Sequence, residues 1–431
     1  MVKQNLLDYY NGIEKALAGH RYSVALSLLE SMVIAGNAPW EVKSEIAQIT
    51  ESFGLLSHYA FSGADDPSRG EQLETLCSRV LTTATQLLRI PLIDDSHKLY
   101  YSVLRYQRSQ PKRTISQLLE SYKAKLNDFA LRRLAGKAQE QSYLKEIHQL
   151  EKEIFEVVWT TYPFTGEDES ALVGIAQDSS VSAEMLNLLA SAVMLGALEY
   201  YDERRHVVLG RYYLAHRKDS DVKALCALMI SLWVNRDRVY GTRFRKVFET
   251  MVEDSLWESD FRIVFLAMAR THDTKRITRT MTEDILPELV RLQPQIDKLM
   301  SEAEKMSDVG SMEENPEWEE MVGKSGLDKK LQALNELQMS GADVMMSTFS
   351  SLKSFPFFFE LSNWFRDFNV DSVESDPHND ISQEVGAFIT SAPMLCDSDK
   401  YSLLLCVQSM SSEQRRMMLG QLEAQMEQNS E

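Results

Sequence analysis

The sequence contains few of the residues that fix disulfide-rich or turn-rich folds. Only four cysteines occur in 431 residues, and none of them belongs to a CxxC pair. This number excludes a disulfide framework and favours small buried thiols in a reducing compartment. Proline and glycine are also scarce, with 11 and 18 residues, so the chain has few of the residues that interrupt regular elements.

The sequence also lacks a long hydrophobic run. The longest nearly apolar stretch, LLASAVMLGAL at 188–198, is far shorter than the roughly 20 residues that span a bilayer. The first residues, MVKQNLLDYYNGIEKAL, contain no apolar core of a signal peptide. We therefore expect a soluble, cytoplasmic protein with no membrane partner.

Positive charge is in deficit. The chain has 46 Lys and Arg against 64 Asp and Glu, which gives a net charge of −18 at pH 7. This balance opposes wholesale binding to nucleic acid or to an anionic membrane, because both are negatively charged. The hydrophobic content of 44% is sufficient for a large core and argues against global disorder.

Sequence motifs for catalysis and metal binding are missing as well. The eight histidines are scattered, with no HExxH and no Cys/His cluster. No GxSxG nucleophile elbow occurs. The VGKSG run at 322–326 lacks the upstream glycine of a phosphate loop, because Trp318 stands in that position. We therefore predict no catalytic residues, no metal and no cofactor, and a protein that is not an enzyme.

What the sequence does contain is a helical pattern, since apolar residues recur at every third or fourth position. LLDYYNGIEKAL with YSVALSLLESMVIAG, and QLETLCSRVLTTATQLLRI with HKLYYSVLRYQ, have the pattern of paired short helices. Residues 112–160 predict two longer amphipathic helices, one on each side of Gly136. Each apolar stripe lasts only a few heptads, and a coiled coil is the alternative interpretation.

An internal repeat follows in the second third of the chain. A shift of 35 residues aligns Ala192 with Ala227. The same shift aligns Asp202 with Asp237, and 36 further residues reach Asp273. Each Asp follows an apolar helix pattern, and its carboxylate can accept from the free N–H groups of the next helix. A helix-pair period of about 35 residues is in the range of α-solenoids.

These patterns together predict an all-α protein, an α-solenoid of antiparallel helix pairs in two subdomains. Pro, Gly and acidic residues in TTYPFTGEDESALVG at 160–174 indicate a loop at the junction between the two. The expected parts are an N-terminal TPR-like region at 1–160, HEAT-like repeats at 175–300, an acidic linker at 301–320 and a C-terminal helical region at 321–431.

An aromatic segment, residues 355–368, lies in the last of these parts. In SFPFFFELSNWFRDF, seven of fifteen residues are Phe or Trp. Full exposure of so many rings would cause aggregation, so we expect most of them in the core, with Pro356 setting a turn. The alternatives are a groove that binds a peptide or helix through one or two aromatic anchors, and a small-molecule pocket. The predicted partner-binding residues are Trp318, Phe358, Trp364 and Phe365.

A basic stretch at 105–145 contrasts with the acidic chain, with ten Lys or Arg against three acidic residues. It indicates either a solvated or internally paired helix face, or a surface for nucleic acid or the ribosome. No RRM, KH or zinc-finger pattern supports sequence-specific recognition of nucleic acid. The basic surface that would serve this alternative function consists of Arg105, Arg108, Arg113, Lys123, Arg132 and Arg133.

Three short runs resemble a largely uncharacterised family of bacterial tetratricopeptide-repeat proteins. They are Asn-Pro-Glu-Trp at 315–318, Gly-Ala-Asp-Val at 341–344 and Asn-Trp-Phe at 363–365, and the likeness covers roughly residues 180–400. YNGIEKALAGHRYSVALSLLE near the start is loosely similar to one tetratricopeptide helix pair. The resemblance implies a helical-repeat fold and no catalytic residues. We therefore expect a cytoplasmic scaffold or adaptor for a protein partner.

Overall fold

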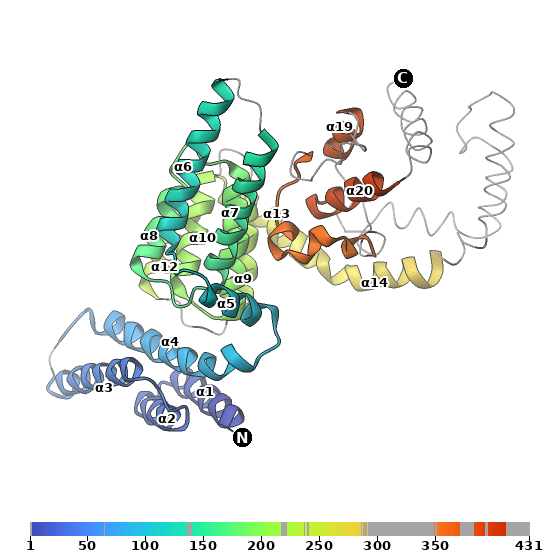
Figure 1. Ribbon diagram of the computed structural model, residues 1–431. Coiled ribbons are helices and arrows are strands. Elements are labelled where there is room, and N and C mark those ends of the chain that lie inside the picture. The colour runs from blue at the N-terminus through green and yellow to red at the C-terminus, as the bar shows by residue number, and fades with distance from the viewer. Residues whose placement is uncertain are drawn as a thin grey trace, which may run out of the picture. The chain divides into compact units, whose positions relative to one another are not determined.

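The computed structural model divides the chain into two compact units, residues 1–258 (unit 1) and 259–431 (unit 2). Every regular element in the described parts of both units is a helix, which confirms the all-α class (Figure 1). Among these described helices, none combines the length and the apolar composition that a membrane crossing requires. The described residues are 2–63, 65–135, 140–216, 222–236, 238, 241–285, 287, 291, 349, 351–370, 383–392 and 395–410.

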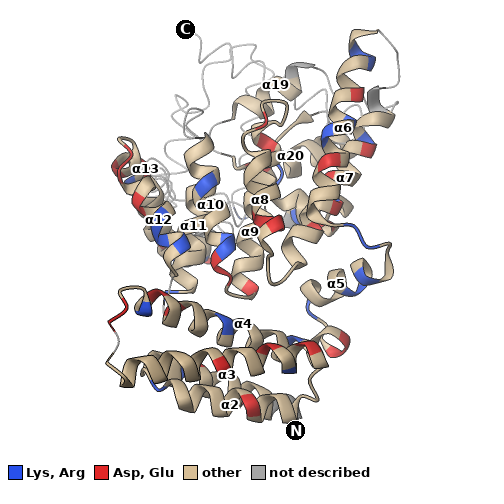
Figure 2. Ribbon diagram, turned by 90° about the vertical axis from the view of Figure 1, so that its left-hand side faces the viewer, with Lys and Arg blue, Asp and Glu red and all other residues tan. Residues whose placement is uncertain are grey.

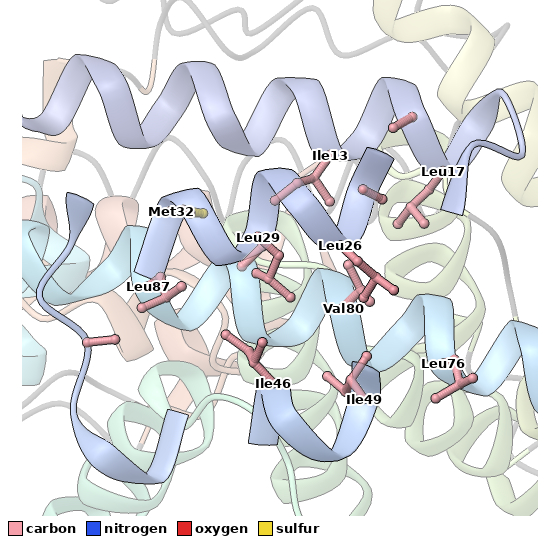
Figure 3. Close-up of a cluster of buried hydrophobic side chains, with 14 of the residues drawn as sticks. Ile13, Leu17, Leu26, Leu29, Met32, Ile46, Ile49, Leu76, Val80 and Leu87 are labelled. Atoms are coloured by element: carbon pink, nitrogen blue, oxygen red, sulfur yellow. The ribbon is translucent and has the colours of Figure 1, made fainter. Parts of the chain in front are cut away.

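The first four helices of unit 1 form one layer. They are α1 (Val2–Ala18), α2 (Tyr22–Ala35), α3 (Trp40–Phe61) and α4 (Arg69–Asp95). α1 packs on α2 and α4, and α3 packs on α4. The predicted pairing of the first two helices is therefore confirmed, whereas α3 was missed. One buried residue from each helix contributes to the shared core in Figure 3: Ile13, Leu29, Ile49 and Val80.

The next helices of unit 1 lie above this layer in Figure 2, and all but the first of them form two rows. They are α5 (Leu99–Ser109), α6 (Ile115–Leu134), α7 (Glu140–Thr160), α8 (Gly166–Ile175), α9 (Ala183–Glu199), α10 (Glu203–His216), α11 (Lys223–Val234) and α12 (Thr242–Val252). α6, α8, α10 and α12 contact one another in that order, and α7, α9 and α11 form a second row against them. α5 contacts both α4 and α7 and so connects the layer to the rows.

α6 and α7 are the two long helices predicted for 112–160, and they pack as an antiparallel pair. Arg113, just before α6, forms an ion pair with Glu153 near the end of α7 at 3.0 Å. Further along α6, Lys125 pairs with Glu146 in the first half of α7. Since α7 also packs on α9, this pair belongs to the two rows and is not a separate coiled coil.

The segment 160–174, predicted to be a loop, is a loop only at 161–165. α8 begins at Gly166, and Thr165 caps it. The backbone N–H of Asp168 donates to the Thr165 hydroxyl at 3.1 Å, and the Asp168 carboxylate accepts the Thr165 N–H at 2.8 Å. The acidic residues thus lie in the first helical turn, where the helix dipole favours negative charge. The segment lies inside unit 1, and the boundaries at 160 and 175 stay predictions.

The 35-residue shift agrees with the helices, because it maps α9 and α10 onto α11 and α12. Asp202 caps α10 as predicted, since a backbone N–H of that helix donates to its carboxylate at 3.0 Å. The cap predicted at Asp273, before α14 (Thr274–Arg279), is wrong. The backbone at Asp273 is already helical (φ −78°, ψ −19°), and its side chain makes no cap hydrogen bond. Asp237 lies outside the described residues.

In unit 2, α13 (Trp257–Arg270) starts just before the unit boundary and continues into η2 (Thr271–Asp273), α14 and a π-helical turn, η3 (Thr280–Ile285). The aromatic segment and the four residues before it form 3-10 turns. These turns are η5 (Ser351–Ser354), η6 (Pro356–Phe359) and η7 (Leu361–Trp364). Pro356 begins η6, as the turn prediction required. The last described helices are α19 (Gln383–Ser391) and α20 (Asp397–Ser409), which pack on each other. The acidic linker at 301–320 lies outside the described residues.

Candidate functional site

A cleft of about 750 Å³ opens in unit 1 between the α3–α4 layer and the first residues of α10 and α12. The wall from α3 and α4 carries Glu41, Glu45 and Glu74. The opposite wall carries Arg204 and Arg243. Figure 2 shows α4 below the helices of the two rows. Charged side chains of both signs therefore line the cleft.

Arg89 of α4 fixes one side of the cleft by capping the C-terminal end of α7. The last carbonyl groups of a helix lack partners within it, and cations stabilise that end. The Arg89 guanidinium donates to the carbonyl oxygens of Thr160 and Tyr162 at 3.3 and 2.9 Å. It also lies 5.1 to 5.7 Å from the ring centroids of Tyr100, Tyr162 and Tyr200. Burial raises the pKa of all three tyrosines, so their hydroxyls stay protonated.

Arg205 of α10 binds the same end of α7 from the other row, and it is completely buried. Its guanidinium donates to the carbonyl oxygens of Val158 and Val193 at 3.1 and 3.3 Å. It lies 4.0 Å from the ring centroid of Phe164. Burial lowers the pKa of Arg205 to about 10, against the opposing effect of Asp202, so the side chain remains a cation at neutral pH. Arg205 therefore fixes α7, α9 and α10 to one another next to the cleft.

Two carboxylates of the cleft are used as helix caps. Asp202 accepts the backbone N–H groups of Phe164 and Arg204 at 2.8 and 3.0 Å. Burial raises the pKa of Asp202, and Arg205 opposes this shift. Glu203 accepts the backbone N–H of Phe244 in the first turn of α12 at 3.0 Å. Because both groups satisfy helix N-termini, they hold the wall in place.

Most other charges of the cleft are held in ion pairs. Arg79 pairs with Glu45 at 2.8 Å across α3 and α4. Glu169 of α8 accepts from Arg204 and lies 3.5 Å from Arg243. The cleft therefore presents a pattern of charges that is fixed before any ligand binds.

Glu41 and Arg108 are the exceptions. Both line the cleft and are exposed, and neither has an ion-pair partner among the described residues. Arg108 belongs to the predicted basic surface, whereas Glu41 was not singled out in the sequence. These two side chains are available to a ligand and can be changed without breaking an ion pair within the described fold.

His206, beside Arg205 on α10, is buried, and its Nδ1 lies 3.1 Å from the carbonyl oxygen of Asp202. Burial lowers the pKa of His206 from 6.5 to about 4. The folded state therefore favours the neutral ring. The buried neutral ring stabilises the folded state fully above pH 6.5, the pKa of this histidine in the unfolded chain. That stabilisation is lost as the pH falls from 6.5 through 4, because the unfolded chain then binds a proton that the folded state does not.

We expect His206→Gln to remove this acid sensitivity. Between pH 7 and pH 4, the wild type should lose roughly 3 kcal/mol more unfolding free energy than the variant, because 2.5 pKa units separate the two states (6.5 − 4). Urea titrations at several pH values measure the difference. His20→Gln, at an exposed histidine, is the control and should keep the wild-type pH dependence. Identical slopes for wild type and His206→Gln would contradict the prediction.

The aromatic segment is partly core and partly surface. Phe358 is buried and lies edge-on to Trp364, with ring centroids 5.3 Å apart. Trp364 is 41% exposed, and its indole N–H donates to the Phe358 carbonyl oxygen at 2.8 Å. Phe365 is half-buried. Phe359, which the sequence analysis did not select, is 75% exposed. Trp318 lies outside the described residues.

A buried ion pair connects the residues next to this segment with α20. Lys353 Nζ lies 2.8 Å from Asp399 Oδ1 of α20 and 4.8 Å from the ring centroid of Phe358. The Tyr401 hydroxyl of α20 also donates to the Asp367 carbonyl oxygen at 2.8 Å. The segment is therefore fixed to α20, and its role in partner binding stays a prediction.

The predicted basic surface is largely paired within the chain. Arg105 donates to the Ile93 carbonyl oxygen at 2.6 Å and so caps the end of α4. Arg133 is exposed on α6. Three other cations of this surface form ion pairs within the chain, as the intramolecular interpretation expects, and nucleic-acid binding stays a prediction. The ion pairs are Arg113 with Glu153 at 3.0 Å, Lys123 with Asp178 at 3.6 Å and Arg132 with Asp128 at 3.0 Å.

No protein-family model, no curated protein and no solved structure matches the chain. Within the described ranges, no three His, Cys, Asp or Glu side chains come together as a metal ion would require. The function of the chain therefore has to be inferred from the geometry of its own residues.

Proposed function

We propose that this chain is a non-catalytic scaffold of the α-solenoid type, and that the cleft of unit 1 binds a segment of a protein partner. The alternating rows of helices and the 35-residue correspondence support the solenoid assignment, which would leave extended faces for a partner. The resemblance to bacterial tetratricopeptide-repeat proteins points the same way, as does the expectation of a cytoplasmic protein.

The observation that carries the binding role is that all the charges of the cleft except Glu41 and Arg108 are already held by partners within the chain. A catalytic acid or base must exchange a proton with the substrate, which needs a group that is free to reach it. Asp202 and Glu203 instead accept helix N–H groups, and Glu45 lies in an ion pair. Fixed charges suit binding, because a partner then loses little free energy in ordering them.

The size and the walls of the cleft indicate what the partner presents. A volume of about 750 Å³ is in the range of ligand sites, which measure about 300–1,000 Å³. Each wall carries side chains of both signs, with Glu45 and Arg79 on one and Glu203 and Arg243 on the other, so the best fit is a segment with side chains of both signs. Such complementarity fixes the register of a bound segment and rejects segments of the wrong charge pattern.

We expect a charge exchange at the two unpaired positions to abolish partner binding. The variant Glu41→Lys with Arg108→Glu keeps the net charge and reverses both available charges. In affinity capture from the native host, we expect it to recover at least about tenfold less of the partner, since like charges now face each other. Circular dichroism verifies that the variant is folded.

The matched control is Glu120→Lys with Lys112→Glu, which also keeps the net charge and changes exposed residues outside the cleft. It should recover as much partner as the wild type. Equal recovery by all three proteins would show that the cleft is not the site. If no protein is captured saturably by the wild type, the scaffold function itself is wrong.

A further inference from the structure

A second groove lies within the α1–α4 layer, between the C-terminal half of α3 and the start of α4, and encloses about 660 Å³. We propose that it docks an amphipathic helix of a partner protein, with leucine-like side chains in the groove and a basic polar face. This inference rests on the proposed scaffold function and names the chemistry of one docking segment.

The groove exists because the apolar side chains of α3 continue beyond the part of the helix that is buried in the shared core. Ile46 and Ile49 in the first half are buried in that core (Figure 3). Further along, Leu55 and Tyr59 are 54% and 59% exposed, although they line the space that faces α4. Exposed apolar side chains beside one another favour association, because a partner removes them from water.

The shape of the groove favours a helix over an extended strand. Leu55 and Tyr59 are four residues apart on one helix, and Leu76 of α4 lies opposite them. Such a row accepts the i, i+3 and i+4 side chains of a second helix. An added strand would need an open sheet edge, and the described part of the layer consists of helices alone.

The charges at the rim select a basic partner. Asp66 and Glu71 line the groove with one cation, Arg69, and the exposed Glu51 and Asp65 lie next to it in the sequence. Asp66 is held as an anion because the Ser68 hydroxyl and backbone N–H both donate to it, at 2.7 and 2.8 Å. Those bonds keep the pKa of Asp66 below its usual value. A lysine-rich helix complements this rim, whereas an anionic membrane or nucleic acid is repelled.

The test uses the full chain and two synthetic fluorescent helices with leucines at i, i+3, i+4 and i+7. One probe carries lysines on its polar face and the other carries glutamates. The lysine probe should bind saturably, and more weakly at high salt. Leu55→Ser with Tyr59→Ser should weaken its binding at least about tenfold. Phe61→Ser, at a 92% exposed residue outside the groove, should leave binding unchanged.

Binding of the glutamate probe as tight as that of the lysine probe would overturn the proposal, and so would equal binding by the double variant. Sedimentation of the unliganded chain tests the other occupant. A wild-type dimer that the double variant dissociates would show that a second copy fills the groove. In the capture assay, a partner kept by the groove variant and lost by the cleft variant would reject the groove and leave the scaffold function standing.

Discussion

Arg205→Leu should destabilise unit 1 by about 4 kcal/mol, because it removes a buried charged donor from several carbonyl groups at once. Arg205 donates to the carbonyl oxygens of Val158 and Trp159 at the end of α7 and to that of Val193 in α9. A leucine fills part of the volume but donates no hydrogen bond. The carbonyl groups of Val158 and Trp159, in the last turn of α7, then lose their buried donor, whereas that of Val193 keeps its bond within α9. Urea unfolding followed by circular dichroism measures the loss.

Arg204→Leu is the control for this prediction. The neighbouring Arg204 pairs with Glu169 at a site that is partly open to solvent. Partly exposed ion pairs contribute little, so we expect a loss of about 1 kcal/mol or less. Comparable losses for the two variants would show that the Arg205 contacts are not what holds the rows together.

Gly196→Ala in α9 is expected to destabilise unit 1 by about 3 kcal/mol or more. A Cβ at this position would lie 2.1 Å from Nη1 and 2.3 Å from Cζ of Arg205. A free arginine could move aside, but this one is fully buried and is held by carbonyl groups on two sides. The clash must therefore break those hydrogen bonds or separate α9 from α10.

Gly174→Ala in α8 is the matched control, because nothing lies within 4 Å of its Cβ position. Alanine is the better helix former, so this variant should gain up to about 1 kcal/mol. A double-mutant cycle adds a sharper test, since Gly196→Ala should cost far less once Arg205 is leucine. Equal costs in both backgrounds would mean that the guanidinium is not the obstacle.

The sequence predicts the helices well because each helix packs one face on its neighbours along its whole length. That face gives apolar residues a regular spacing of three or four, which can be read from the sequence. The apolar stripes of α6 and α7 predict both helices directly. The spacing of the internal repeat predicts that Asp202 caps the start of α10. Asp273 shows the limit of that argument, since a carboxylate caps only where the backbone leaves the helical conformation. The acidic residues of 160–174 were misread for a related reason, because Thr165 starts a helix among them.

The cleft was missed because its parts are far apart in the sequence. Arg89 and Arg205 belong to helices separated by more than a hundred residues, yet both cap α7. A single arginine within an apolar stretch of a helix, as in LLRIPLI of α4, is the sequence signal that could have indicated a buried cation. Phe359 was missed because the aromatic segment forms 3-10 turns, and the face it exposes does not follow α-helical spacing.

Hydrogen exchange of the chain, alone and with the partner recovered by capture, tests the central claim most directly. If the cleft binds the partner, exchange should slow in the peptides around Glu41, Thr83 and Thr242, which come from three different helices that line the cleft. Protection confined to α6 or to the aromatic segment, with exchange at the cleft unchanged, would contradict the account.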